Sequence, residues 1–167
     1  MERDQDYERL VEPIERQMIA AIWKIVRDPA DFDDAFQEAC IKVWKRLSRI
    51  RRHPNPHALI LRICVNTAYD ALRKRNRRWK AEERSRRAQC LPNPEGGPMQ
   101  RERRERLIDA IGVLPRNQAQ SILMRFMEGL SYDAIAQVLG CNESTVRTHV
   151  ERGCRRLHLV LSDLEIP

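Results

Sequence analysis

Apolar residues recur every three or four positions along most of the 167-residue chain, a spacing that places them on one face of an α-helix. The first stripe consists of Leu10, Ile14, Met18, Ile22 and Ile25. We expect its helix to end near Asp28-Pro29, because proline does not continue a helix. The next helix is expected to begin at Asp31 or Asp33, whose carboxylates suit a helix N-terminus. Its apolar stripe consists of Phe32, Phe36, Ala39, Val43 and Leu47.

This second predicted helix also carries a polar face that a protein core does not need. The face consists of Asp34, Gln37, Glu38 and Lys42. Residues 48–56 then interrupt the helical pattern with two prolines and a run of basic and histidine side chains. Asn55 and Pro56 have the character of an N-cap and a first-turn proline, so they predict the start of a third helix.

The third predicted helix is apolar on one side and basic on another. Its apolar side consists of Leu59, Ile60, Ile63, Cys64, Thr67, Ala71 and Leu72. Its candidate nucleic-acid contacts are Arg62, Asn66, Tyr69, Arg73, Arg75, Arg77 and Arg78, with Trp79 beyond. Cations can follow a phosphate backbone and aromatic rings can stack on unpaired bases. A solvated amphipathic helix with Trp79 against the core explains the same pattern equally well.

Residues 90–100 contain three prolines and two glycines and are not expected to hold a helix. Beyond them, Ser131 is a predicted N-cap, Gly140 a C-terminal stop, and Asn142 the cap of a long last helix. A short helix, a turn with glycine and a longer helix form the helix-turn-helix pattern. The sequence therefore predicts an all-α fold with a first domain at residues 1–80, a flexible linker at 81–100, and a helix-turn-helix domain of the winged-helix-like class at 101–167.

The last helix carries a second set of candidate nucleic-acid contacts. With Val146 and Val150 facing inward, the residues left outward are Thr145, Arg147, Thr148, His149 and Arg152. A recognition helix presents such side chains to base edges and phosphates. An ordinary helical bundle would show the same spacing, so this pattern alone leaves both interpretations open.

Charge is distributed unevenly along the chain, whose formal net charge is +7. Residues 1–38 hold 11 acidic and 5 basic residues, residues 39–87 hold 3 and 16, and residues 88–167 hold 10 of each. An acidic segment followed by a strongly basic one suits a protein that binds another protein on one side and a polyanion on the other. A solvated helical surface is the alternative.

Several classes of function receive no support from the sequence. The five cysteines are widely spaced without a Cys-x-x-Cys motif, which favours free thiols in a reducing cytoplasm. We find no signal-peptide pattern, no membrane-length apolar run, no phosphate-binding glycine loop and no nucleophile elbow. The pairs Cys154/His158 and His53/His57 have a spacing that zinc uses, but isolated pairs are seldom ligands. We therefore expect no cofactor, no metal and no enzymatic activity.

Three stretches resemble the extracytoplasmic-function (ECF) branch of the sigma-70 family of RNA polymerase sigma factors. Residues 31–44 resemble the family's Asp-Ala-Glu-Asp-x-x-Gln-Glu…Trp helix, and residues 62–73 resemble its Arg-Ile-Ala-x-Asn…Asp-x-x-Arg helix. Residues 114–148 resemble its second domain. The order and the intervening linker also match. The chain departs from the family pattern at Leu59, where a Trp is usual, at His149, where an Arg is usual, and at Gly153 and Cys154, where an Ala-Arg pair is usual.

The resemblance implies a non-catalytic initiation factor that binds the beta-prime and beta subunits of core RNA polymerase and the −10 and −35 elements of promoter DNA, with an anti-sigma protein as a further candidate partner. The implied polymerase-binding residues are Asp34, Gln37, Glu38 and Trp44. The implied DNA-binding residues are Arg51, Arg52, His53, Arg62, Asn66, Tyr69, Arg73, Arg77, Arg116, Ser144, Thr145, Arg147, Thr148, His149 and Arg152. The alternative is a helix-turn-helix transcriptional regulator whose first domain senses a signal or dimerises.

Overall fold

The computed structural model describes residues 2–85 and 98–162, with side chains placed for residues 3–78 and 103–162. The described residues contain helices and no strand, which confirms the predicted all-α fold. The elements are α1 (Glu2–Val11), η1 (Glu12–Ile14), α2 (Glu15–Val26), α3 (Pro29–Lys45), α4 (Leu47–Arg51), α5 (Pro56–Ser85), α6 (Pro98–Gly112), α7 (Arg116–Ile122), η2 (Leu123–Met127), α8 (Tyr132–Leu139) and α9 (Glu143–Ser162). No helix among them is both long and apolar enough to cross a membrane.

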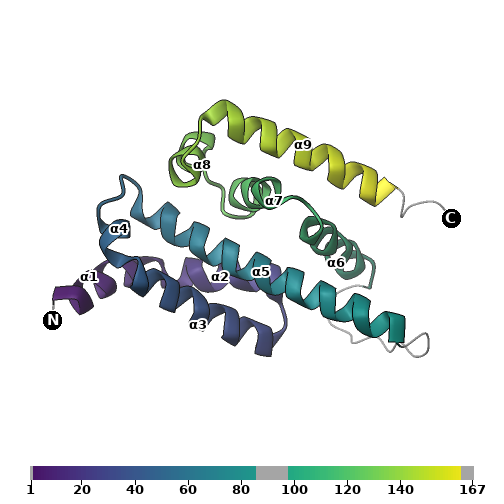
Figure 1. Cartoon of the computed structure of the whole chain (residues 1–167), viewed down its shortest axis with the longest axis horizontal. Coiled ribbons are helices and arrows are strands. Elements are labelled where there is room, and N and C mark those ends of the chain that lie inside the picture. The colour runs from purple at the N-terminus through teal and green to yellow at the C-terminus, as the bar shows by residue number, and fades with distance from the viewer. Residues whose placement is uncertain (1, 86–97, 163–167) are drawn as a thin grey trace.

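The first domain, α1 to α5, is a helical bundle built around α5, which packs against both α2 and α3 (Figure 1). Its largest fully buried side chains include Tyr69, Met18, Ile22, Ile25, Ile60 and Leu72. The predicted cap of α5 is confirmed, because the side-chain oxygen of Asn55 accepts a hydrogen bond from the Ala58 amide at 3.1 Å. The long amphipathic helix α5 therefore presents one face to the core and leaves another to carry the site.

Three local predictions in this domain are wrong. The stripe that starts at Leu10 does not lie on one continuous helix, because Pro13 lacks an amide hydrogen and the chain makes a short 3₁₀ turn there. Helix α3 begins at Pro29 rather than Asp31 or Asp33, since Asp28 is its cap and accepts from the Asp31 amide at 3.0 Å. The expected break after α3 is itself partly helical, as α4.

The second domain, α6 to α9, has the predicted helix-turn-helix. The Ser131 hydroxyl caps α8 by accepting from the Ala134 amide at 3.1 Å, and Gly140 ends it with a left-handed φ of 69°. At Gly153 a Cβ atom would lie 2.5 Å from Cδ1 of Ile122, so α9 approaches α7 more closely than an alanine permits without a shift. The close packing of α9 against α7 therefore explains why this chain has glycine at this position.

The segment η2 after α7 is wound as a π-helix, which adds a residue to the turn. Ile122 and Phe126 are four residues apart and would share one face of a regular α-helix. Here, however, Ile122 is buried whereas Phe126 is 64% exposed.

The two domains contact each other, because α5 packs against α6, α7, α8 and η2 of the second domain. Figure 1 shows the second domain lying along α5, on the side away from α3. Most of the predicted linker, residues 86–97, lies outside the described residues. The expectation that residues 90–100 hold no helix is wrong at their end, because Pro98 occupies the first turn of α6, where proline is tolerated.

Candidate nucleic-acid interface

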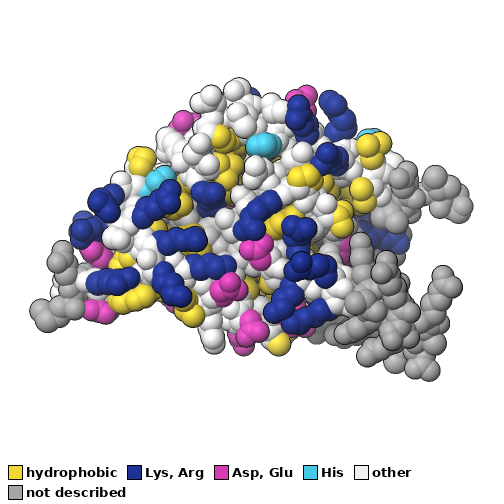
Figure 2. Space-filling model, in the orientation of Figure 1, with side chains coloured by type: hydrophobic (Ala, Val, Ile, Leu, Met, Phe, Trp, Pro, Cys, Tyr) yellow, Lys and Arg dark blue, Asp and Glu magenta, His cyan; other side chains and the backbone are white. Residues whose placement is uncertain are grey.

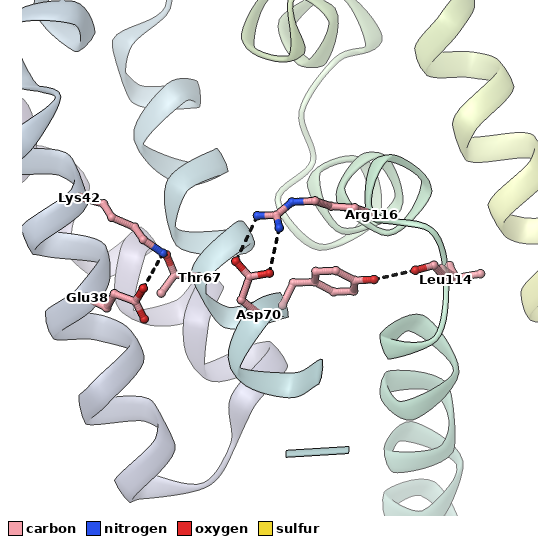
Figure 3. A network of polar contacts seen from close by, with 7 residues as sticks. Glu38, Lys42, Thr67, Asp70, Leu114 and Arg116 are labelled. Atoms are coloured by element: carbon pink, nitrogen blue, oxygen red, sulfur yellow. Dashed lines mark hydrogen bonds and ion pairs between the residues drawn. The ribbon is translucent and has the colours of Figure 1, made fainter. Parts of the chain in front are cut away.

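The polar face of α3 lies at the surface, as the sequence predicted. Asp34, Gln37 and Glu38 are all exposed. Glu38 forms a 2.8 Å ion pair with Lys42, one helical turn away, yet its side chain remains 59% exposed. Lys42 also donates to the Thr67 hydroxyl of α5 at 3.2 Å, which ties the two helices together (Figure 3). The geometry leaves two carboxylates and an amide available to a partner.

Trp44 packs differently from the rest of the predicted polymerase-binding set. The guanidinium of Arg3 lies 4.9 Å from the Trp44 ring centroid and donates to the Trp44 carbonyl at 2.9 Å. Tyr7 meets the same ring edge-on at a centroid distance of 5.5 Å. Helix α1 therefore covers part of Trp44, and direct contact of this side chain with polymerase stays a prediction.

An aromatic row lies near the polar face of α3, and its exposed member, Trp23, was missed by sequence reasoning. Trp23 of α2 is 42% exposed and meets Phe32 edge-on at 5.3 Å, and Phe32 stacks with Phe36 at 5.9 Å. Ile19 and Trp23 are four residues apart on α2 and lie outside the stripe formed by the buried residues of that helix. That offset was the available signal for an exposed apolar strip.

Cations gather around α4 and the start of α5, on the left of the view in Figure 2. Arg51 and Arg52 are exposed, although Arg51 pairs with Asp6 of α1 at 2.7 Å and Arg52 donates to the Ser48 carbonyl at 3.0 Å. The ring of His53 accepts from the Asn55 amide at 3.0 Å, which fixes the turn before α5. These three predicted DNA contacts therefore lie together on one basic surface.

The predicted DNA face of α5 divides into two parts. Arg73 and Arg77 are exposed. Arg62, Asn66 and Tyr69 instead face the second domain. Tyr69 is fully buried and its hydroxyl donates to the Leu114 carbonyl at 2.6 Å, while Arg62 donates to the Val138 carbonyl. Contact of these three with DNA stays a prediction, and it requires the second domain to move off α5.

The contact between the domains also contains ion pairs (Figure 3). Arg116, a predicted phosphate contact, donates to both carboxylate oxygens of Asp70, at 3.1 Å each. Lys24 donates to the Met127 carbonyl at 2.7 Å and pairs with Glu128 at 3.3 Å. Arg116 of the second domain, like Arg62 and Tyr69 of the first, is thus engaged with the other domain in this closed arrangement.

A cavity of about 590 Å³ lies between the domains; we call it the interdomain cavity. Its lining residues from the first domain are Lys42, Arg46, Arg49, Ile50, His53, Leu59, Arg62, Ile63, Asn66 and Thr67. Those from the second domain are Arg116, Asn117, Gln120, Gln137, Val138, Leu139 and Gly140. Burial lowers the pKa of Arg62, and the nearby positive charges of Arg49 and Arg46 lower it further. The cavity is therefore strongly electropositive.

Helix α9 has the predicted register, with Val146 and Val150 buried. Of the predicted contacts, the exposed ones are Ser144, Arg147 and Arg152, and the half-buried ones are Thr145, Thr148 and His149.

The side chain of Arg147 is held in place by its neighbours. Its Nε donates to Glu143 at 3.1 Å and its guanidinium lies 4.4 Å from the Tyr132 ring centroid. Arg125 lies 4.8 Å from the same centroid, so Tyr132 is contacted by two cations and was missed by sequence reasoning. These contacts orient Arg147 before any partner binds.

Potential metal ligands and thiols are dispersed over the described part of the chain. No group of three or more potential metal ligands gathers there. Cys40, Cys64, Cys141 and Cys154 are free thiols, and Cys90 lies outside the described residues. The remaining features are an acidic surface with aromatic residues and two basic surfaces.

Comparison with known proteins assigns both domains. Residues 10–78 match the family Sigma-70 region 2, and residues 104–157 match Sigma-70, region 4. The region 2 match decides against a regulator with a sensing or dimerisation domain. The chain is 28% identical to the RNA polymerase sigma-H factor of Pseudomonas aeruginosa over 95% of its length and 87% of that protein. It is 32% identical to the ECF RNA polymerase sigma-E factor of Escherichia coli, over 73% of its length and 69% of that protein.

Solved structures share the fold. The sigma factor RpoE in complex with the anti-sigma factor NepR from Bartonella quintana superposes with a TM-score of 0.58 at 20% identity, over 95% of this chain and 98% of that one. CnrH in complex with the cytosolic domain of CnrY gives a TM-score of 0.58 at 21% identity, over 96% and 89%. The order of the matched regions and the identity to curated sigma factors agree with the resemblance found in the sequence. The chain belongs to the sigma-70 family and is an RNA polymerase sigma factor of the ECF type.

Proposed function

We propose that this sigma factor holds core RNA polymerase with the exposed face of α3 and promoter DNA with the basic faces of α5 and α9. The observation that carries the proposal is the separation of charge: exposed carboxylates lie on α3, and cations gather around α4, α5 and α9. A sigma factor directs core polymerase to promoters and initiates transcription. We assign no catalytic residue to this chain, because polymerase supplies the chemistry, and we place its action in the cytoplasm, where core polymerase and the chromosome meet.

The proposed contact on α3 is with the beta-prime subunit. Exposed Trp23, backed by Phe32, offers a large apolar side chain beside the polar face of Asp34, Gln37 and Glu38. An aromatic anchor with a polar rim is the usual anatomy of a specific protein interface. For the beta subunit, the second domain offers Phe126, which is highly exposed on η2.

The proposed −10 site combines the turn after α4 with the face of α5. Arg51, Arg52 and His53 supply positive charge, and Asn66 supplies an amide that can pair with an unpaired base. Unpaired bases show their full hydrogen-bonding edges, so they can be read when the strand is peeled away. Because Asn66 is covered here, the second domain must leave α5 before promoter opening.

The proposed −35 site is the N-terminal half of α9 in the major groove. Arginine is the side chain best suited to bridge both acceptors of guanine, and Arg147 is exposed and oriented by Tyr132. Ser144 and Arg116 are the proposed phosphate contacts, and on opening Arg116 would be released from Asp70, with which it is paired here. An anti-sigma protein is a further proposed partner, since one structural relative was solved in complex with an anti-sigma factor.

The test of this assignment is charge reversal on α3. Glu38→Lys and Asp34→Lys are expected to weaken binding to purified core polymerase while helicity, measured by circular dichroism, stays unchanged. Glu8→Lys is the matched control, because Glu8 is also exposed but lies on α1. If both α3 variants bind core as tightly as the control, the interface lies elsewhere.

A further inference from the structure

The interdomain cavity carries an unusual imbalance of charge. Five cations and His53 line it, and its lining among the described residues includes no aspartate or glutamate. Lys42, Arg62 and Arg116 have partners nearby, in Glu38, a backbone carbonyl and Asp70. Arg46 and Arg49 are left with no ion pair or side-chain hydrogen bond within the part of the chain that the structure describes.

Closing the second domain over α5 has an energetic cost at this place. Nε of Arg62 and Oδ1 of Asn66 are both buried without a hydrogen-bond partner. A buried polar group without a partner destabilises the state that buries it, and like charges gathered in one cavity repel each other. A closed arrangement with this cavity is therefore one that an anion inside it would stabilise.

We propose that the interdomain cavity binds a small anion bearing two or more phosphate groups, such as a nucleoside polyphosphate, and that the bound anion holds the second domain against α5. Guanidinium groups bind phosphate oxygens in forked pairs, and the amides of Asn117, Gln120 and Gln137 add polar groups around the cavity. The volume of about 590 Å³ is that of a small-molecule site. Both domains contribute residues to the site. Binding of the anion therefore stabilises the closed arrangement, in which these residues lie together.

The consequence for transcription rests on the function proposed above. Arg62 and Asn66 line the cavity and are also assigned to the −10 element. A chain with the anion bound is therefore unable to present these residues to unpaired DNA, and the anion and the DNA compete.

The binding test uses the full chain and inorganic tripolyphosphate as the probe, in isothermal titration at 0.15 M salt with EDTA present. Wild-type chain is expected to bind one tripolyphosphate. Arg46→Gln/Arg49→Gln is expected to weaken this binding by about tenfold or more. The matched control is Arg103→Gln/Arg155→Gln, which removes the same charge from exposed positions outside the cavity. If the control pair weakens binding as much as the cavity pair, or if wild type does not bind, the proposal is overturned.

A second arm separates the sources of phosphate and links binding to closure. In this arm ATP and GTP replace tripolyphosphate. Tighter binding of a nucleotide than of tripolyphosphate would show that the cavity also contacts the nucleoside, and equal binding would show that it recognises the phosphates alone. Tripolyphosphate is expected to displace a labelled single-stranded −10 oligonucleotide from the wild-type chain. It is not expected to displace the oligonucleotide from the Arg46→Gln/Arg49→Gln variant.

If the chain supports promoter-specific transcription but binds no tripolyphosphate, the inference fails and the proposed function stands. If tripolyphosphate binds but transcription is absent, the proposed function fails instead.

Discussion

Tyr69→Phe is the smallest change that separates the closed arrangement from an open one. The Tyr69 hydroxyl is fully buried and donates to the Leu114 carbonyl of the other domain at 2.6 Å. Burial raises its pKa, so it remains a protonated donor at neutral pH. Its ring belongs to a hydrophobic cluster that both domains share, and phenylalanine retains that packing. The substitution therefore removes one contact between the domains and little else.

The expected magnitude follows from that hydrogen bond. Losing it and leaving a buried carbonyl without a partner costs the closed arrangement about 1–2 kcal/mol, which raises the ratio of open to closed chains about five- to thirtyfold. A −10 single strand binds only open chains, so its apparent Kd is expected to fall by up to that factor. Stacking on the ring is unaffected by the loss of the hydroxyl.

Fluorescence anisotropy with a labelled −10 oligonucleotide measures this effect. Tyr132→Phe is the matched control, because it removes a hydroxyl from the second domain at a position where no hydrogen bond to α5 is formed. Thermal unfolding by circular dichroism checks that the first domain is intact. Weaker binding by Tyr69→Phe would refute the reasoning and make the hydroxyl a direct DNA contact. Binding equal to the control would show that this bond does not hold the domains together.

The other expectations concern single positions in the two domains. Asn66→Ala is expected to slow promoter opening, followed with permanganate footprinting, more than it weakens the closed promoter complex; opening at the normal rate contradicts the −10 assignment. Arg147→Ala is expected to relax preference at one or two −35 positions in a variant library, by about 1–3 kcal/mol; a uniform loss would make it a phosphate contact. Burial raises the pKa of the Cys64 thiol to about 12. At pH 8 Cys64 therefore holds about a thousandfold less thiolate than free cysteine, so Ellman's reagent should modify exposed Cys154 first and Cys64 only after unfolding. Gly153→Ala gains helix propensity but meets α7, with an expected net loss of about 1 kcal/mol in urea unfolding that trimming the facing isoleucine to valine reverses.

Local signals in the sequence predicted those parts of the fold that depend on neighbouring residues. Asn55, Ser131 and Gly140 mark helix ends through their own side chain or backbone freedom, and the structure confirms each of them. The register of α9 follows from its valines in the same way. The helix-turn-helix could therefore be predicted from the sequence alone.

Features that depend on distant contacts could not be predicted in the same way. The spacing of Arg62, Asn66 and Tyr69 placed them on one face of a helix but did not show what covers that face. Phosphate, unpaired bases and the carbonyls of another domain all satisfy the same donors. The partners of Tyr69 and Arg62 lie 45 and 76 residues away along the chain, in the second domain. Trp23 was missed for a similar reason, since its exposure depends on where α3 packs.

The central claim is that this chain gives core RNA polymerase its promoter specificity. Its most direct test is run-off transcription on the genomic DNA of the source bacterium, with purified core polymerase and sequencing of the 5′ ends. With the wild-type chain, transcripts are expected to begin downstream of shared −35 and −10 elements, and Glu38→Lys is expected to reduce them. Core alone is expected to give no such set of start sites. If adding the chain leaves the start sites of core unchanged, the account is contradicted.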